Sequence, residues 1–264
     1  MTVDLTWKKP EINRQNAEFF GRAAHLAYND PQVIEASLPE LGLQLVKFFD
    51  CQNTQAYLAK NDKACVLAFR GTQPAILVDW LSDLDAHQVN GPVGKVHEGF
   101  LCALHYIWLD VWKTLQNERG MRSLWITGHS LGGALAVLAA AKLRFEKAQP
   151  INGVYTYGQP RVGDFEFCSR YDNGFGDYTF RFVNFKDIVP RVPFRTMNFY
   201  DLGQFFYFNE NNYDPETTWG EILLRNVGRT IQQMVKKNGV TDHYMDNYLL
   251  KLKSLADFTN FHDM

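Results

Sequence analysis

The residues most able to do chemistry lie in one short motif, Gly128-His-Ser-Leu-Gly132, with Ser130 at its centre. Residues 124–127 predict a short buried strand before the motif, and the alanine- and leucine-rich run after it predicts a helix. A G-x-S-x-G on a tight strand-to-helix turn lifts a serine hydroxyl above a sheet, where it can attack a carbonyl carbon. The motif in this context predicts a serine hydrolase.

A serine hydroxyl at neutral pH needs a base that takes its proton. In α/β-hydrolases the acid follows the serine in sequence and the histidine comes last. Of seven histidines, only His243 and His262 follow Ser130. His262 lies close to the C-terminus, where chains fray, whereas His243 lies between Asn238-Gly239 and a helical pattern. We therefore expect His243 to be the base.

The carboxylate that would orient this histidine must lie between the two. Asp187 directly follows the apolar-rich run 178–186 and precedes a segment with two prolines that would stiffen its loop. A carboxylate just past the C-terminal end of a strand lies on the edge where α/β sheets bind ligands. Asp187 is the expected acid, and Asp164 is the second choice, although Gly163-Asp164 reads more naturally as a turn or helix cap.

Acyl transfer also needs N–H donors for the developing oxyanion. The backbone N–H of Leu131, directly after the serine, is one expected donor. The second should follow an earlier strand, and the run 65–69 ends in Arg70-Gly-Thr72, which favours the N–H of Thr72.

A candidate lid follows at about residues 73–90. Apolar residues recur in a stretch that should be surface loop, and they would cover the site or contact a lipid–water interface. Core packing is the other explanation for some of them. These residues are Ile76, Leu77, Val78, Trp80 and Leu81.

Strands alternate with helices along the chain, which predicts an α/β fold with a mainly parallel central sheet flanked by helices. No linker or repeat divides it, so residues 1–264 are expected to form one domain. Aromatic residues near 199–208 could line an acyl groove, although a plain strand is the better reading. Predicted helices cover 13–29, 99–117 and 219–237, with another after His243, and predicted strands cover 43–49, 56–60, 65–69, the run before Ser130, 153–157, 179–185 and 204–208.

Composition excludes several function classes. A formal net charge of −2 provides no field for nucleic acid, and no apolar run approaches the ~20 residues of a membrane span. The four cysteines, Cys51, Cys65, Cys102 and Cys168, show no metal-ligand spacing. Reduced thiols are expected, with a Cys51–Cys65 bridge left open. The N-terminus lacks a signal-peptide pattern, so a cytoplasmic protein is expected, with secretion by another route or a trimmed leader as alternatives.

Seven motifs run in a fixed order over about residues 65–250. They are Phe69-Arg-Gly-Thr72, Asp79-Trp-Leu-Ser-Asp-Leu84, Val96-His-Glu-Gly-Phe100, Thr127-Gly-His-Ser-Leu-Gly-Gly133, Tyr157-Gly-Gln-Pro-Arg-Val-Gly-Asp164, Asn184-Phe-Lys-Asp-Ile-Val-Pro-Arg-Val-Pro193 and Asp242-His-Tyr244. In these motifs the chain resembles the class 3 lipases, the fungal-type triacylglycerol lipases of the α/β-hydrolase fold. The resemblance implies Ser130 as nucleophile, Asp187 as acid, His243 as base, Thr72 and Leu131 as oxyanion hole, and a short lid near 74–84.

The resemblance also implies a lipid or other ester as substrate, transient contact with a lipid–water interface, and no cofactor. Triacylglycerol hydrolysis through an acyl-enzyme is the first expectation. An esterase, a phospholipase A1, a feruloyl-type esterase and a non-catalytic binding member of the fold are the alternatives. The chain departs from many secreted fungal members in having no evident signal sequence or disulfides, and its segment between Thr72 and Trp80 is slightly longer.

Overall fold

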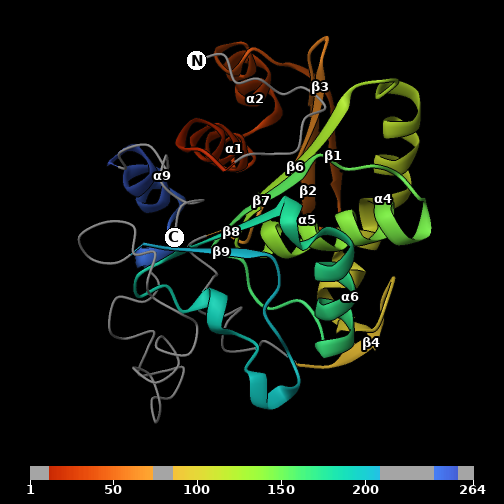
Figure 1. Cartoon of the computed structure of the whole chain (residues 1–264). Coiled ribbons are helices and arrows are strands. Elements are labelled where there is room, and N and C mark those ends of the chain that lie inside the picture. Colours follow the sequence, from red (N-terminus) through yellow and green to blue (C-terminus); the bar gives the residue numbers. More distant parts are fainter. Residues whose placement is uncertain (1–11, 74–85, 209–240, 255–264) are drawn as a thin grey trace.

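A seven-stranded sheet lies at the centre of the computed structural model, which describes residues 12–73, 86–208 and 241–254 (Figure 1). The strands lie in the order β1-β2-β3-β6-β7-β8-β9. Their bounds are β1 Gln44–Cys51, β2 Thr54–Lys60, β3 Ala64–Phe69, β6 Ser123–His129, β7 Gly153–Tyr157, β8 Thr179–Asn184 and β9 Gln204–Phe208.

Pairing within the sheet changes from antiparallel to parallel at β3. β1 pairs with β2, and β2 with β3, in antiparallel register, because only short turns connect them. From β3 onward each neighbouring pair is parallel, which requires a longer crossover at every step. The carboxyl ends of β6, β7 and β8 therefore meet at one edge of the sheet.

Helices cover both faces of the sheet (Figure 1). On one face lie α1 (Arg14–Leu26), α2 (Pro31–Ser37) and α9 (Met245–Ser254), whose buried side chains join one apolar cluster. On the other lie α4 (Glu98–Glu118), α5 (Leu131–Ala141) and α6 (Phe165–Phe175), whose buried side chains join the second.

Short elements connect these layers. β4 (Gln88–Asn90) and β5 (Lys95–His97) form a separate antiparallel hairpin. α5 continues into a π-helical turn at Lys142–Glu146. The 3₁₀ turns lie at Leu38–Leu41, Gly176–Tyr178, Val189–Arg191, Arg195–Met197 and Thr241–His243.

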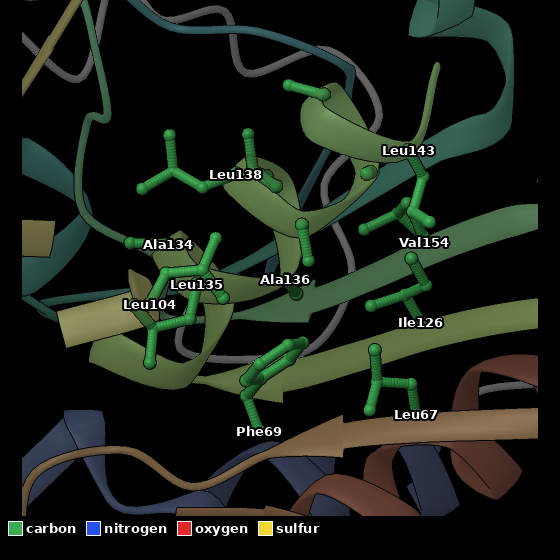
Figure 2. Close-up of a cluster of buried hydrophobic side chains, with 14 of the residues drawn as sticks. Leu67, Phe69, Leu104, Ile126, Ala134, Leu135, Ala136, Leu138, Leu143 and Val154 are labelled. Carbon is green, nitrogen blue, oxygen red and sulfur yellow. The ribbon is translucent and has the colours of Figure 1, made fainter. Parts of the chain in front are cut away.

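The core forms because central strands bury both of their faces. In β3, Leu67 and Phe69 pack under α5 whereas Val66 and Ala68 face α1. Helix α5 is apolar on nearly every side, since it is enclosed between the sheet and α4. Figure 2 shows its alanines and leucines packed on Leu67, Phe69, Ile126 and Val154.

The predicted α/β architecture is confirmed, and all seven predicted strands are present within about two residues of their expected ends. The aromatic run near 204–208 is a plain strand, with Phe206 and Phe208 on one face and Phe205 and Tyr207 on the other. The structure adds α2, α6 and the β4–β5 hairpin, which the sequence patterns did not predict. The predicted helix 219–237 lies outside the described residues.

The last three residues of the candidate lid at 73–90 form strand β4, which pairs with β5. Its apolar residues Ile76, Leu77, Val78, Trp80 and Leu81 lie outside the described residues. Within the described ranges, no helix is both long and apolar enough to cross a membrane.

Candidate active site

Ser130 occupies a sharp turn between the last residue of β6 and the first residue of α5. Its backbone has φ 59° and ψ −131°, a conformation that residues other than glycine rarely adopt. The turn is held because Ser130 N–H donates to the Tyr157 carbonyl at 2.9 Å. Gly128 and Gly132 permit it, since a Cβ on either would collide with backbone atoms. This geometry is the nucleophile elbow that the motif predicted.

Asp187 and His243 are brought together across 56 residues of sequence. His243 Nδ1 lies 2.8 Å from Asp187 Oδ2, and both side chains are buried. The other carboxylate oxygen, Oδ1, accepts the Val189 N–H at 2.9 Å, inside the turn that the prolines stiffen. Because the carboxylate accepts, we assign the Nδ1 proton to His243, which leaves Nε2 with a lone pair.

Ser130 Oγ and His243 Nε2 are both buried and have no hydrogen-bond partner among the described residues. The imidazole lies against Gly158, directly after β7, where a Cβ would come within 2.7 Å of His243 Cε1. Gly158 has φ +58°, a backbone conformation that glycine adopts without strain, and its lack of a Cβ leaves room for the imidazole ring. The two unpartnered atoms thus belong to groups gathered at the carboxyl ends of β6, β7 and β8.

Three backbone anchors fix the segment that carries His243. Asn184, the last residue of β8, donates its Nδ2 to the Asp242 carbonyl at 2.8 Å. The Lys186 N–H donates to Asp242 Oδ2 at 3.3 Å. His129 Nε2 contacts the carbonyl of His243 itself at 2.6 Å. The loop position of His243 is therefore set by the end of the sheet.

The two predicted oxyanion donors belong to segments that flank Ser130. Leu131 is the first residue of α5, so its N–H is at a helix N-terminus, where the dipole favours negative charge. Gly71 lies close to the elbow, since a Cβ there would come within 2.9 Å of Ser130 Cβ. Thr72 follows directly in the chain. The predicted pair of donors thus comes from segments on either side of the serine.

The alternative acid, Asp164, has a structural task. It is the N-cap of α6, and its Oδ1 accepts from Phe167 N at 2.8 Å and from Lys95 N at 3.1 Å. This is the capping role that its sequence context favoured. The alternative base, His262, lies outside the described residues.

A buried charge cluster supports the loop that follows Asp187. Asp201 Oδ1 accepts from Arg161 Nε at 3.0 Å and from Arg181 Nη1 at 2.7 Å, and its Oδ2 accepts from Arg195. Burial alone would raise the pKa of Asp201, but the arginines hold that pKa below its usual value. Arg161 and Arg181 in turn donate to the Pro193 and Pro190 carbonyls, so the cluster fixes the proline-containing segment.

Sequence reasoning missed residues that contact this site from behind. Tyr248 of α9 donates to Asp187 Oδ2 at 2.6 Å, and Tyr28, after α1, hydrogen-bonds His129 at 2.7 Å. His129 was visible only as a variable position of the serine motif. The i,i+5 spacing of His243 and Tyr248 gave no signal, because it matches no helical contact.

The fold and the elbow define an α/β-hydrolase. The profile of the family described as Lipase (class 3) matches residues 66–197, which is half of the chain. The chain belongs to the class 3 lipase family.

Relatives in plants and fungi agree with that assignment. Triacylglycerol lipase OBL1 of Arabidopsis thaliana is 31% identical over 258 residues, covering 74% of this chain and 50% of that protein. A lipase of Rhizomucor miehei is 33% identical over 177 residues, covering 62% of this chain and 47% of its own. The chain thus spans about half the length of these curated relatives.

Solved structures show the same fold. The Rhizomucor miehei lipase propeptide complex superimposes with a TM-score of 0.67 at 28% identity, over 75% of this chain and 68% of that one. Lipase II from Rhizopus niveus superimposes with a TM-score of 0.72 over 88% and 94% of the two chains. Because the two sequences are only 24% identical, this similarity shows a shared fold and nothing more.

Proposed function

We propose that this protein hydrolyses carboxylic esters through an acyl-enzyme on Ser130, and that triacylglycerols are its substrates. The observation that supports the chemistry most is the 2.8 Å hydrogen bond between His243 Nδ1 and buried Asp187, behind a serine elbow. The relatives described as triacylglycerol lipases support the choice of substrate.

In the proposed reaction, Ser130 Oγ attacks the ester carbonyl carbon while His243 Nε2 takes the hydroxyl proton. Asp187 stabilises the resulting imidazolium and keeps its ring in place. The Leu131 and Thr72 N–H groups donate hydrogen bonds to the negative oxygen of the tetrahedral intermediate, and the loss of one such donor typically costs about 10²–10³ in rate.

The intermediate collapses when His243 gives its proton to the departing alcohol oxygen. Water then attacks the acyl-enzyme with His243 again as base, which releases the carboxylic acid and restores Ser130. No oxidant, reductant or organic cofactor enters this balance. An interfacial lid from residues 73–90 belongs to the same proposal.

A fluorophosphonate probe tests the nucleophile. Wild type should be labelled at one serine, Ser130→Ala should show no labelling, and Ser254→Ala, which changes an exposed serine of α9, should label normally. Asp187→Ala should react about 10⁴-fold more slowly than wild type, because Asp187 orients the base without transferring the proton. Absence of labelling in folded wild-type protein would contradict the proposal.

A substrate series tests the class of ester. It comprises p-nitrophenyl esters from acetate to palmitate, an emulsified triacylglycerol, phosphatidylcholine vesicles and a methyl ferulate. Turnover of the emulsion above the soluble esters supports a triacylglycerol lipase. Turnover of short soluble esters only, of phospholipid, or of the ferulate would move the assignment to an esterase, a phospholipase A1 or a feruloyl-type esterase respectively.

A further inference from the structure

His129 lies beside the nucleophile but is turned away from it. Its ring is buried, with Nδ1 2.7 Å from the Tyr28 hydroxyl and Nε2 2.6 Å from the carbonyl oxygen of His243. A carbonyl only accepts hydrogen bonds, so Nε2 carries the proton. Nδ1 is then an acceptor, and the Tyr28 hydroxyl must be its donor. Both ring nitrogens are committed, and one of them holds the backbone of the proposed base.

Tyr28 extends this connection to the other side of the site. Its hydroxyl oxygen also accepts a hydrogen bond from the backbone N–H of Gly71, the residue before Thr72. The fit leaves no free space, because any side chain at Gly71 would collide with the Tyr28 hydroxyl and with the His129 carbonyl. The Arg70 guanidinium lies over the Tyr28 ring, with 5.9 Å between them. Tyr28 is therefore fixed by the same loop that carries the proposed oxyanion donor.

Together these contacts form one continuous chain of hydrogen bonds. Gly71 N–H donates to Tyr28 Oη, Tyr28 O–H donates to His129 Nδ1, and His129 Nε2–H donates to the His243 carbonyl. The chain starts at the loop proposed to stabilise the oxyanion and ends on the residue proposed to move the proton.

The charge state of His129 suits this role. Burial first, and then the neighbouring His243, lower the pKa of His129 well below its usual value, so the ring stays neutral near pH 7. The groups that face it are Tyr28, His243 and Tyr248, with His25 acting from further away. A protonated ring would lose its acceptor for Tyr28. Burial raises the pKa of the Tyr28 hydroxyl, so that donor stays protonated too.

We propose that Tyr28 and His129 are positioning residues that hold the backbone of His243 in register with the oxyanion loop at Gly71-Thr72. The proposal rests on the function proposed above, since it assigns what these residues do for that reaction. Both act through other groups, and neither touches substrate. Their loss should therefore lower transition-state stabilisation and leave ground-state binding unchanged.

Three variants test the proposal on a soluble p-nitrophenyl ester. Tyr28→Phe keeps the ring and removes only the hydroxyl, and we expect kcat to fall about 10-fold with an unchanged KM. His129→Leu removes both hydrogen bonds, and kcat should fall by about 10². His129→Gln can still donate to the His243 carbonyl, so it should recover most of the activity that leucine loses.

Tyr57→Phe is the matched control. Tyr57 is buried, and its hydroxyl donates to the Ala23 carbonyl at 2.8 Å on the same face of the sheet, in a hydrogen bond that includes no residue of the site. Tyr57→Phe and Tyr28→Phe should lower the melting temperature by similar amounts, but only Tyr28→Phe should lower kcat. Equal kcat values for the two variants would overturn the proposal, as would a glutamine variant no better than leucine.

The outcome is separable from failure of the proposed function. If folded wild type neither hydrolyses esters nor reacts with a fluorophosphonate, the proposed function fails. If wild type does both and Tyr28→Phe retains its full kcat, only the positioning role fails. Because Tyr28→Phe preserves the ring and its packing, the test does not depend on the fold tolerating the changes at His129.

Discussion

The hydroxyl of Tyr248 donates to Asp187 Oδ2 at 2.6 Å, the same carboxylate oxygen that accepts the ring N–H of His243. Burial first, and then the nearby carboxylate, raise the pKa of Tyr248 well above its usual value, so this donor stays protonated. The hydroxyl also accepts the Asn184 N–H at 2.9 Å, which ties α9 to the end of β8. One side chain thus orients the acid and joins two elements of the site.

Removal of that hydroxyl should impair both activity and stability. In Tyr248→Phe, we expect kcat to fall about 10-fold, because Asp187 loses a charge-assisted hydrogen bond. The free energy of unfolding should fall by about 1–3 kcal/mol, since the Asn184 N–H loses its acceptor as well. Ester hydrolysis and urea unfolding measure the two effects.

Tyr171→Phe is the control for that variant, because Tyr171 hydrogen-bonds Thr179 at 2.9 Å in the opposite apolar layer. It should lose stability and keep kcat. A Tyr248→Phe enzyme with wild-type kcat would show that Asp187 is oriented without Tyr248.

The serine elbow should not tolerate a methyl group at Gly132. A Cβ there would collide with the Phe69 carbonyl oxygen, which is backbone and cannot move aside cheaply. We expect Gly132→Ala to lose about 3 kcal/mol or more of the free energy of unfolding, or to fail to fold. Thermal melting together with fluorophosphonate labelling measures this.

Gly174→Ala provides the comparison, because Gly174 lies in α6 and a Cβ there would meet Phe145 at an ordinary 3.4 Å. That variant should be as stable as wild type or gain about 0.5–1 kcal/mol, since alanine favours helix. If Gly132→Ala and Gly174→Ala have the same stability, the close approach of backbone atoms is not the reason that position 132 requires glycine.

Asp201 should be needed for stability, although it lies outside the reacting groups. In Asp201→Asn the buried guanidiniums of Arg161 and Arg181 lose their carboxylate, and we expect a loss of about 3–5 kcal/mol in the free energy of unfolding. Chemical denaturation at pH 7 measures this. Asp110→Asn, which breaks the exposed pair with Lys47, should have a much smaller effect.

The same carboxylate predicts an acid limb in wild-type stability. The pKa of Asp201 is lower in the folded protein than in the unfolded chain, so the unfolded state binds the proton first. Its contribution is fully present above the unfolded pKa of about 3.9 and is lost as pH falls through the lower folded value. Between pH 5 and pH 3, wild type should lose more stability than Asp201→Asn, and parallel curves would contradict this assignment.

Thiol reactivity should divide the four cysteines into two pairs. All four are free thiols in the structure, with Cys51 and Cys102 exposed and Cys65 and Cys168 buried. Burial raises the pKa of the Cys65 and Cys168 thiols, which keeps them out of the reactive thiolate form. A disulfide reagent such as Ellman's should titrate two thiols in native protein and four in denaturant. Protection of Cys51 or Cys102 in the native protein would contradict the exposure described above.

Local patterns predicted the sheet, and they also supplied the candidate residues that the structure brings to one edge of it. Central strands have to be apolar on both faces, which makes runs such as residues 64–69 and 153–157 visible in the sequence. The order of serine, acid and histidine reduced the candidates to Ser130, Asp187 and His243. Helix α2 escaped prediction because it is only seven residues long, and α6 because Ser, Asp, Asn and Gly, which have low helix propensity, fall within it.

By itself the sequence determined the strand and helix periodicities, the elbow glycines and the candidate residues, because each depends on residue type and spacing within one segment. Tertiary structure alone decided which groups support those candidates. Tyr28 lies 101 residues from His129, and Tyr248 lies 61 from Asp187, so no local pattern could join them. The physical reason is that parallel crossovers bring distant strand ends to one edge, and hydrogen bonding there depends on that packing.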